Sequence, residues 1–516
     1  MKNTNNFARR ITALLASLVL VLTITQPSQA QRWTPTSPEM NSIGVNISES
    51  VPESTGGTSQ FLMMDPLPPG VSGMPNQTLC NDFGQECLPT TGRIPYAKLV
   101  LPPCESGDFE NCIESLYFID TASGSKTKAT LIRTISGPTV AANEELGVPF
   151  GGTTSLWQAE GFTHEGNADT YAITANLELG TNGKTFTLSN LNAVVNPYTQ
   201  ISGNYKTIEY AVSTQNGVTF AGSSGVDLSC AWNEAGLCGS LQDFGSNVKL
   251  ELSLRVSTQI SGWFKGRLSK ASISTKELSK TQRRLIFSGE PIQVPVFAFS
   301  KPKSEATPAE LAYMEAAAGW IGGWMGSRSD EPRSVKALDT FRESAKDTAT
   351  ALLSTWSVGA IAPSGNVCLS DRTKVHGLVT TNSMLYQPNA PSFKSGTLSY
   401  QVSGTHYLPD GKTLSLGSYE LIMNSTTARC LYGFSNAPIS ASVTISGSDQ
   451  VATTVVSEKS GWLKLSANGF TFSNKTIKVK LNQKKKTITC VTKKKPTKTK
   501  KVTAYSPKCP TGYKKK

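Results

Sequence analysis

The chain has 516 residues, of which 38% are apolar and 17% are charged. This length predicts two or three domains, and the composition excludes a disordered chain, a collagen, a coiled coil and a multi-span membrane protein. The formal net charge is +13, but 16 lysines and no acid lie between Lys475 and Lys516, and the first 30 residues add three cations. Removing these 19 charges from +13 leaves −6 for residues 31–474. The overall charge therefore does not indicate a nucleic-acid-binding body.

Residues 1–30 are predicted to be a signal peptide for secretion. Basic residues precede an apolar run from Ile11 to Ile24, and the small residues Ser28 and Ala30 are typical of a cleavage site. The apolar run is shorter than the roughly 20 residues that span a bilayer, so a retained membrane anchor is the less favoured alternative. We therefore expect an exported protein.

Ten cysteines agree with export, because an even number of cysteines in an exported chain indicates a set of disulfides. They form close sequential pairs, which are Cys80 with Cys87, Cys104 with Cys112, Cys230 with Cys238, Cys368 with Cys430, and Cys490 with Cys509. We predict nearest-neighbour bridges, although crossed pairing among the first four cysteines stays open. No C-x-x-C pair occurs and there are only three histidines, so neither a metal site nor a cofactor is expected.

The region 31–93 is rich in Pro, Gly and Ser, which predicts an extended leader. Within it, Leu88-Pro89-Thr90-Thr91-Gly92 matches a wall-sorting signal. Such a signal needs a hydrophobic span and a basic tail directly after it, near the end of the chain. We therefore interpret this stretch as a loop next to Cys87.

The regions 94–303 and 358–482 share alternating apolar and polar runs broken by turn residues, which predicts antiparallel β structure. The first region suits one or two β domains, and the second suits an immunoglobulin-like sandwich tied by Cys368 and Cys430. The fold class is therefore predicted to be mainly β, with immunoglobulin-like or antiparallel β-sandwich domains and an inserted two-helix hairpin.

The inserted hairpin is predicted at 304–357, where the apolar period changes to that of a helix. Thr307-Pro308-Ala309-Glu310 is a capping box with proline at the first helical position. Apolar residues then recur at helical spacing up to Trp324, and again from Val335 to Trp356. We expect both apolar stripes to be buried against a β domain.

The most specific signature lies at the end of the chain. It consists of Thr487-Ile488-Thr489-Cys490-Val491, a lysine-rich turn, Lys501-Val502-Thr503-Ala504 and Pro507-Lys508-Cys509-Pro510-Thr511-Gly512-Tyr513-Lys514. This arrangement resembles the ITCVKGK…PKCPxGYKK-type lysine-rich ending of exported actinobacterial cell-envelope proteins. Segments 428–435 and 452–456, with Gly461-Trp462, are similar to the sandwich that often precedes it, and Cys104 with Asn111-Cys112-Ile113-Glu114 resembles the start of the same architecture. One departure is Val491-Thr492-Lys493, where Val-Lys-Gly is usual. The resemblance implies a location at the cell envelope and no particular chemistry.

No catalytic residue is predicted. Hydrolysis by a serine or cysteine nucleophile needs an activating base, but no G-x-S-x-G motif occurs and every cysteine has an expected partner. His376 and His406 are interpreted as structural, and the Gly161–Asp169 stretch around His164 as a solvated loop. A pair of glycosidase carboxylates leaves no local spacing signal, so that alternative stays open.

One small loop is a candidate for ligand contact. A bridge between Cys230 and Cys238 would present Trp232, whose indole could stack on a sugar while Asn233 and Glu234 bind hydroxyl groups. The alternative is that Trp232 packs over its own disulfide.

Residues 483–516 are predicted to form a lysine-rich, disulfide-tied tail that binds anionic cell-wall or membrane-surface polymers, because ammonium groups attract phosphate and salt weakens the attraction. Nucleic acid is not an expected partner, since only Tyr505 and Tyr513 could stack on bases. The lysines concerned are Lys484, Lys485, Lys486, Lys493, Lys494, Lys495, Lys498, Lys500, Lys501, Lys508, Lys514, Lys515 and Lys516.

These patterns predict an extracellular, envelope-associated modular protein. We expect an adhesin-like or structural surface module without catalysis, retained by its basic tail. The alternative is a secreted carbohydrate-binding protein or polysaccharide hydrolase, and extracellular glycans or proteins are further candidate partners. A deep cleft with convergent carboxylates would favour the alternative, whereas filled sandwiches with a flat surface would favour the first function.

Overall fold

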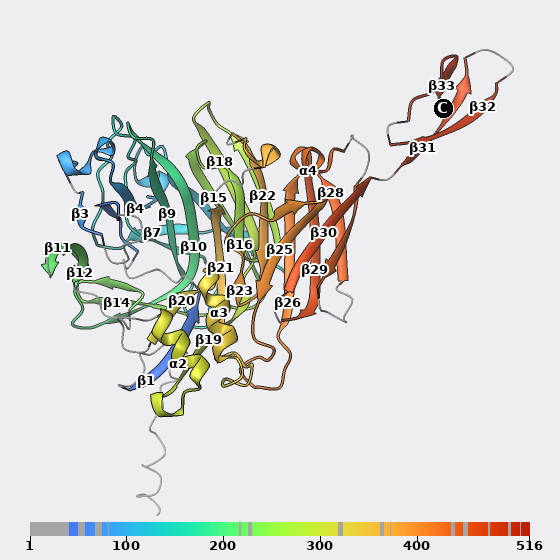
Figure 1. Ribbon diagram of the computed structural model, residues 1–516. Coiled ribbons are helices and arrows are strands. Elements are labelled where there is room, and N and C mark those ends of the chain that lie inside the picture. The colour runs from blue at the N-terminus through green and yellow to red at the C-terminus, as the bar shows by residue number, and fades with distance from the viewer. Residues whose placement is uncertain are drawn as a thin grey trace, which may run out of the picture.

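The computed structural model describes most of the chain after residue 40 (Figure 1). The predicted signal peptide and Lys484, Lys494 and Lys495 lie outside the described residues. The described ranges are 41–49, 57–67, 75–80, 82–215, 218–224, 230–317, 324–361, 366–371, 373–434, 439–446, 453–472, 475–483, 485–493, 497–505 and 507–516.

A long central sheet organises the fold. The ten strands of its main row are antiparallel to their neighbours except for β16 and β22, which run parallel to each other. In spatial order the strands are β7 (Thr130–Thr134), β8 (Ser155–Gln158), β9 (Thr170–Thr181), β10 (Phe186–Ser202), β21 (Ala351–Ile361), β16 (Gly262–Arg267), β22 (Val375–Thr381), β26 (Leu416–Asn424), β29 (Trp462–Thr471) and β28 (Thr453–Lys459).

Shorter strands extend this sheet at three places. The second half of β9, beyond its pairing with β8, pairs with β4 (Ile94–Val100). In turn β4 pairs with β2 (Gln60–Met64), and β2 pairs with β3 (Gln77–Leu79). The first half of β21 pairs with β19 (Ile292–Pro302), followed by β1 (Ser42–Ser48) and β20 (Trp324–Arg328). The end of β10 pairs with the hairpin of β14 (Leu237–Leu241) and β13 (Trp232–Glu234). A separate two-stranded ribbon is formed by β11 (Glu209–Gln215) and β12 (Val218–Ser224).

Two further sheets cover opposite faces of the central sheet. The first contains β17 (Ser269–Glu277), β18 (Gln282–Glu290), β15 (Val248–Ser257), β5 (Cys112–Asp120) and β6 (Lys126–Lys128). The second contains β23 (Leu385–Tyr386), β25 (Thr397–Ser403), β30 (Lys475–Gln483) and β27 (Ile439–Ile445), with β24 (Ser392–Lys394) beside β25. Neighbouring residues of a strand point to opposite faces of the sheet. On β16, Phe264 is therefore buried in the core under the first of these sheets, and Trp263 in the core under the second. We call these the first core and the second core.

The mainly β, sandwich-type fold is therefore confirmed. Sheet hydrogen bonds nevertheless cross the boundaries expected at 303 and 357, because β21 pairs with β10, β16 and β19. Strands from both predicted β regions thus pair within the central sheet. The expected leader also contains a core strand, since Val45 of β1 is fully buried between β19 and β20.

In the described residues the α-helices are α2 (Pro308–Ala317), α3 (Pro332–Phe341) and α4 (Ser425–Tyr432). The capping box is confirmed, since the Glu310 carboxylate accepts from the Thr307 amide at 2.7 Å. Leu338 and Phe341 of α3 are buried against β1 and β19, as expected for an apolar stripe. Both helices are shorter than predicted, because Trp324 begins β20 and Trp356 lies in β21. Within the described residues, no helix combines the length and apolar character needed to cross a membrane.

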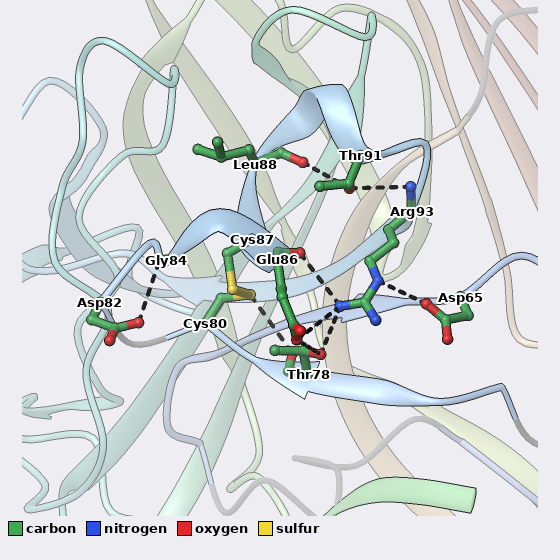
Figure 2. Close-up of a disulfide and its surroundings, with 10 residues drawn as sticks. All are labelled: Asp65, Thr78, Cys80, Asp82, Gly84, Glu86, Cys87, Leu88, Thr91 and Arg93. Atoms are coloured by element: carbon green, nitrogen blue, oxygen red, sulfur yellow. Dashed lines mark hydrogen bonds and ion pairs between the residues drawn. A yellow bond between two sulfur atoms is a disulfide. The ribbon is translucent and has the colours of Figure 1, made fainter.

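All five nearest-neighbour disulfides are confirmed and no cysteine is free, which indicates an oxidising environment outside the cytoplasm. Figure 2 shows the first bridge, Cys80–Cys87, with Arg93 below the adjoining turn. Arg93 contacts Asp65 at 2.7 Å and the Thr78 hydroxyl at 2.7 Å. The stretch that matches a sorting signal forms a short 3₁₀ turn (Pro89–Thr91) beside this bridge, as the loop interpretation predicted.

Candidate functional site

The central sheet has one polar area on the face that also carries the second core. On β9, Ile173, Ala175 and Leu177 are buried in the first core. The residues between and after them, Thr174, Asn176 and Glu178, lie on the opposite face of the strand. The same alternation continues on β10, where Leu191 and Ala193 are buried in the first core and Asn190 and Asn192 face the other way. These polar residues form the floor of a cavity of about 260 Å³, which we call the polar cavity.

The strand registers align the floor in rows. One row crosses five strands, and it contains Val100, Asn176, Asn192, Gly359 and Lys265. Because cross-strand neighbours in antiparallel sheets share a face, all five positions point into the cavity. The row therefore brings together residues that are up to 259 positions apart in the chain.

Gly359 keeps the middle of that row open. A β-carbon at this position would lie 2.5 Å from Oδ1 of Asn192 and 3.5 Å from Cε of Lys265. The first distance is too short for unbonded atoms, so any side chain would displace the Asn192 amide and fill part of the floor. Glycine thus keeps this part of the cavity open.

Next to this row, Glu178 lies opposite Asn190, and its charge acts on Lys98. Glu178 accepts hydrogen bonds at 3.2 Å from the amide groups of both Asn190 and Asn192. Burial lowers the pKa of Lys98 to about 8, with Arg328 acting in the same direction and Glu178 opposing them. Lys98 is thus a partly desolvated amine that loses its proton unusually easily.

The walls bring further charges from distant segments. Lys265 pairs with Asp330 at 2.5 Å, and Arg328 contacts the other oxygen of Asp330 at 3.6 Å. Burial would raise the pKa of Asp330, but Lys265 outweighs it and holds that pKa below its usual range. Asp330 therefore stays ionised at neutral pH.

An arginine beside the cavity fixes two wall residues. Arg267, only 1% exposed, pairs with the Glu49 carboxylate and donates to the carbonyl groups of Thr381 and Ser383 at 2.8 and 2.7 Å. Its guanidinium also lies 4.2 Å from the ring centroid of Tyr386. Burial and these contacts position Glu49 and Tyr386 at the cavity wall.

The predicted ligand-contact loop is not on the surface. Trp232, Asn233 and Glu234 are 0%, 1% and 4% exposed, so the expectation of a presented indole is wrong. Trp232 lies opposite Gly239 in the hairpin, and a β-carbon at Gly239 would come within 2.9 Å of the indole. The ring can therefore fold back over its own hairpin against Tyr198, at 5.4 Å between centroids. Glu234 is held by a bidentate pair with Arg133.

Two of the three histidines are buried and hydrogen-bonded. His164 is buried rather than solvated, with its ring nitrogens hydrogen-bonded to the Tyr198 carbonyl and the Gly166 amide. His376 is buried beside the Thr427 hydroxyl at 3.0 Å. Among the described residues, no group of three or more His, Cys, Asp or Glu is arranged to hold a metal ion.

The C-terminal residues 485–516 form a second candidate site, which we call the tail element. It is a three-stranded sheet of β32 (Thr499–Ala504), β31 (Lys486–Thr492) and β33 (Tyr513–Lys515), tied by Cys490–Cys509, and it stands apart from the sandwiches (Figure 1). The third strand was not predicted. All of its described lysines are exposed, and they are Lys485, Lys486, Lys493, Lys498, Lys500, Lys501, Lys508, Lys514, Lys515 and Lys516.

The lysines lie on both faces of the tail element. Lys500 and Lys515 both pair with Cys490, whereas Lys501 pairs with Thr489 on the opposite face. The sheet buries little besides Cys490 and Val491. A sheet with so small a core is marginal in water, which explains the covalent tie.

No protein-family model matches the chain, and no curated protein is similar to it. The resemblance of the tail to the endings of exported actinobacterial proteins therefore stays a prediction.

Proposed function

We propose that this chain is an exported cell-envelope protein that the tail element retains on anionic wall or membrane-surface polymers. The observation that carries the proposal is the set of exposed lysines on a disulfide-tied sheet with no acidic residue in it. Lysines on both faces can contact a polymer from either side. Near an anionic membrane each lysine contributes on the order of 1 kcal/mol.

The polar cavity favours a binding role for the body over a purely structural one. Each of its three carboxylates is already engaged, Glu49 by Arg267, Asp330 by Lys265, and Glu178 by two asparagines. A glycosidase needs one carboxylic acid that stays protonated. Since Asp330 is held ionised, we favour carbohydrate binding without hydrolysis as the role of the cavity.

Retention can be tested by deleting residues 485–516 from the full-length gene. The truncated protein should appear in the medium with its disulfide-linked body intact, and high salt should release the intact protein from cells because screening shortens the range of the attraction. A truncated protein that stays on cells as firmly as the intact one would contradict the proposal.

A further inference from the structure

The polar cavity is lined by charges of both signs. The lining includes three carboxylates, Glu49, Glu178 and Asp330, and three cations, Lys98, Lys265 and Arg328, and Glu49 is also paired with Arg267 outside the lining. A strongly anionic ligand would meet the carboxylates and a strongly cationic one the ammonium and guanidinium groups. Apolar ligands are disfavoured because desolvating these groups without new hydrogen bonds is costly.

Uncharged hydroxyl groups suit such a site. A hydroxyl both donates and accepts, so it can donate to a carboxylate and accept from an ammonium group or an amide. The floor offers three amides, Asn176, Asn190 and Asn192, and each of these also does both. The cavity volume of about 260 Å³ is slightly below the usual range for small-molecule sites, which suits a single small unit.

A second cavity of about 660 Å³ lies on the other part of the Tyr386 side chain, which lines both cavities. The chain segment that supplies Asp330 to the polar cavity supplies Glu331 to this second one. Its lining again includes amides and hydroxyls, such as Gln387 and Ser399. A ligand made of linked polar units could therefore extend past Tyr386.

We propose that the polar cavity binds one unit of a neutral glycan chain, with the next units lying in the second cavity beyond Tyr386. This inference rests on the proposed binding role of the body and is independent of the tail element. The floor row through Asn192, Gly359 and Lys265 holds the first unit.

The test uses the full-length exported protein and calorimetric titration with neutral tri- and tetrasaccharides of glucose, galactose, mannose and N-acetylglucosamine. Oligogalacturonate and chondroitin sulfate fragments form the anionic arm. Gly359→Ala fills the floor at Asn192. The matched control is Gly180→Ala, on the same face of β9 outside the cavity, where a β-carbon would meet neighbours only at 3.5 Å or more.

At least one neutral oligosaccharide should bind, with affinity at least tenfold weaker in Gly359→Ala and within twofold of the parent in Gly180→Ala. Binding that increases from tri- to tetrasaccharide would support the second cavity as part of the site. If Gly359→Ala does not fold, Asn176→Ala replaces it with the same expectation.

Three results would overturn the inference. They are the absence of binding to every neutral oligosaccharide, equal binding by Gly359→Ala, and a loss in Gly359→Ala that is confined to the anionic arm. Anionic binding that survives Gly359→Ala but disappears in the chain without 485–516 would belong to the tail element, so failure at the two sites is distinguishable.

Discussion

Replacing Lys98 by methionine should stabilise the folded protein at neutral pH. Methionine keeps much of the length and apolar stem of lysine but removes the amine that the polar cavity desolvates. Since burial lowers the pKa of Lys98, the folded state holds this charge at a cost. Residues that serve a binding or catalytic site often lower the stability of the fold, because the site needs charges that packing alone would not favour.

The pKa gives the size and pH range of the effect. It falls from the ordinary 10.5 to about 8, and at 1.36 kcal/mol per unit this corresponds to a cost of about 3 kcal/mol. Because Lys98 keeps partial contact with solvent, we expect a gain of about 1–3 kcal/mol for Lys98→Met. Below pH 8 both states bind the proton and the gain is present in full. Between pH 8 and 10.5 only the unfolded state binds it, so the gain shrinks as pH rises and is lost above 10.5.

Urea denaturation of the parent and Lys98→Met at pH 7 and pH 10, with disulfides intact, measures this difference. Lys128→Met, at an exposed lysine on β6, is the control and should change the free energy of unfolding by at most ~0.5 kcal/mol. A destabilised Lys98→Met at pH 7, or a gain that is equal at both pH values, would refute the reasoning about the cavity.

Three further changes test other parts of the structure by urea denaturation. Replacing Cys368 and Cys430 by serine opens a loop of 62 residues and should cost about 4 kcal/mol; an unchanged midpoint would contradict this. Glu310→Gln should cost about 2 kcal/mol at pH 7. Although burial would raise the pKa of Glu310, Lys301 lowers it to about 2, so this cost should fade between pH 4.5 and 2. Trp232→Ala should cost about 3–5 kcal/mol, because the buried indole leaves a void in the hairpin.

The alternation of apolar and polar residues predicted strands correctly where one face of the strand is apolar. The alternation in β9 identifies Ile173, Ala175 and Leu177 as core residues, and the structure buries them. The same alternation marks Asn176 and Glu178 as polar but does not say whether solvent or a cavity covers them. That depends on long-range pairing, because Lys98, Asn192, Gly359 and Lys265 reach the site from four other strands.

The misassigned helix shows where periodicity is ambiguous. Leu352 and Trp356 are spaced four residues apart, which fits a helix, but a spacing of four also fits one face of a strand. Trp356, Val358 and Ala360 continue with a period of two and share the first core. Pairing of β21 with strands on both sides decides in favour of the strand.

The prediction of a ligand-contact loop at Cys230–Cys238 was wrong for a different reason. The bridge between Cys230 and Cys238 was predicted, but the bridge alone does not fix where the indole of Trp232 points. Gly239, directly across the hairpin, is the sequence signal that could have indicated a ring folded inward, because glycine leaves space for it.

The most direct test of the proposed function is the fraction of full-length protein bound to isolated envelopes of the producing organism. Two variants are compared, one with every lysine of residues 485–516 changed to glutamine and one with each changed to arginine. If charge retains the protein, the glutamine variant should be lost to the supernatant while the arginine variant stays bound at physiological salt. Equal binding of the glutamine variant would contradict electrostatic retention by the tail element.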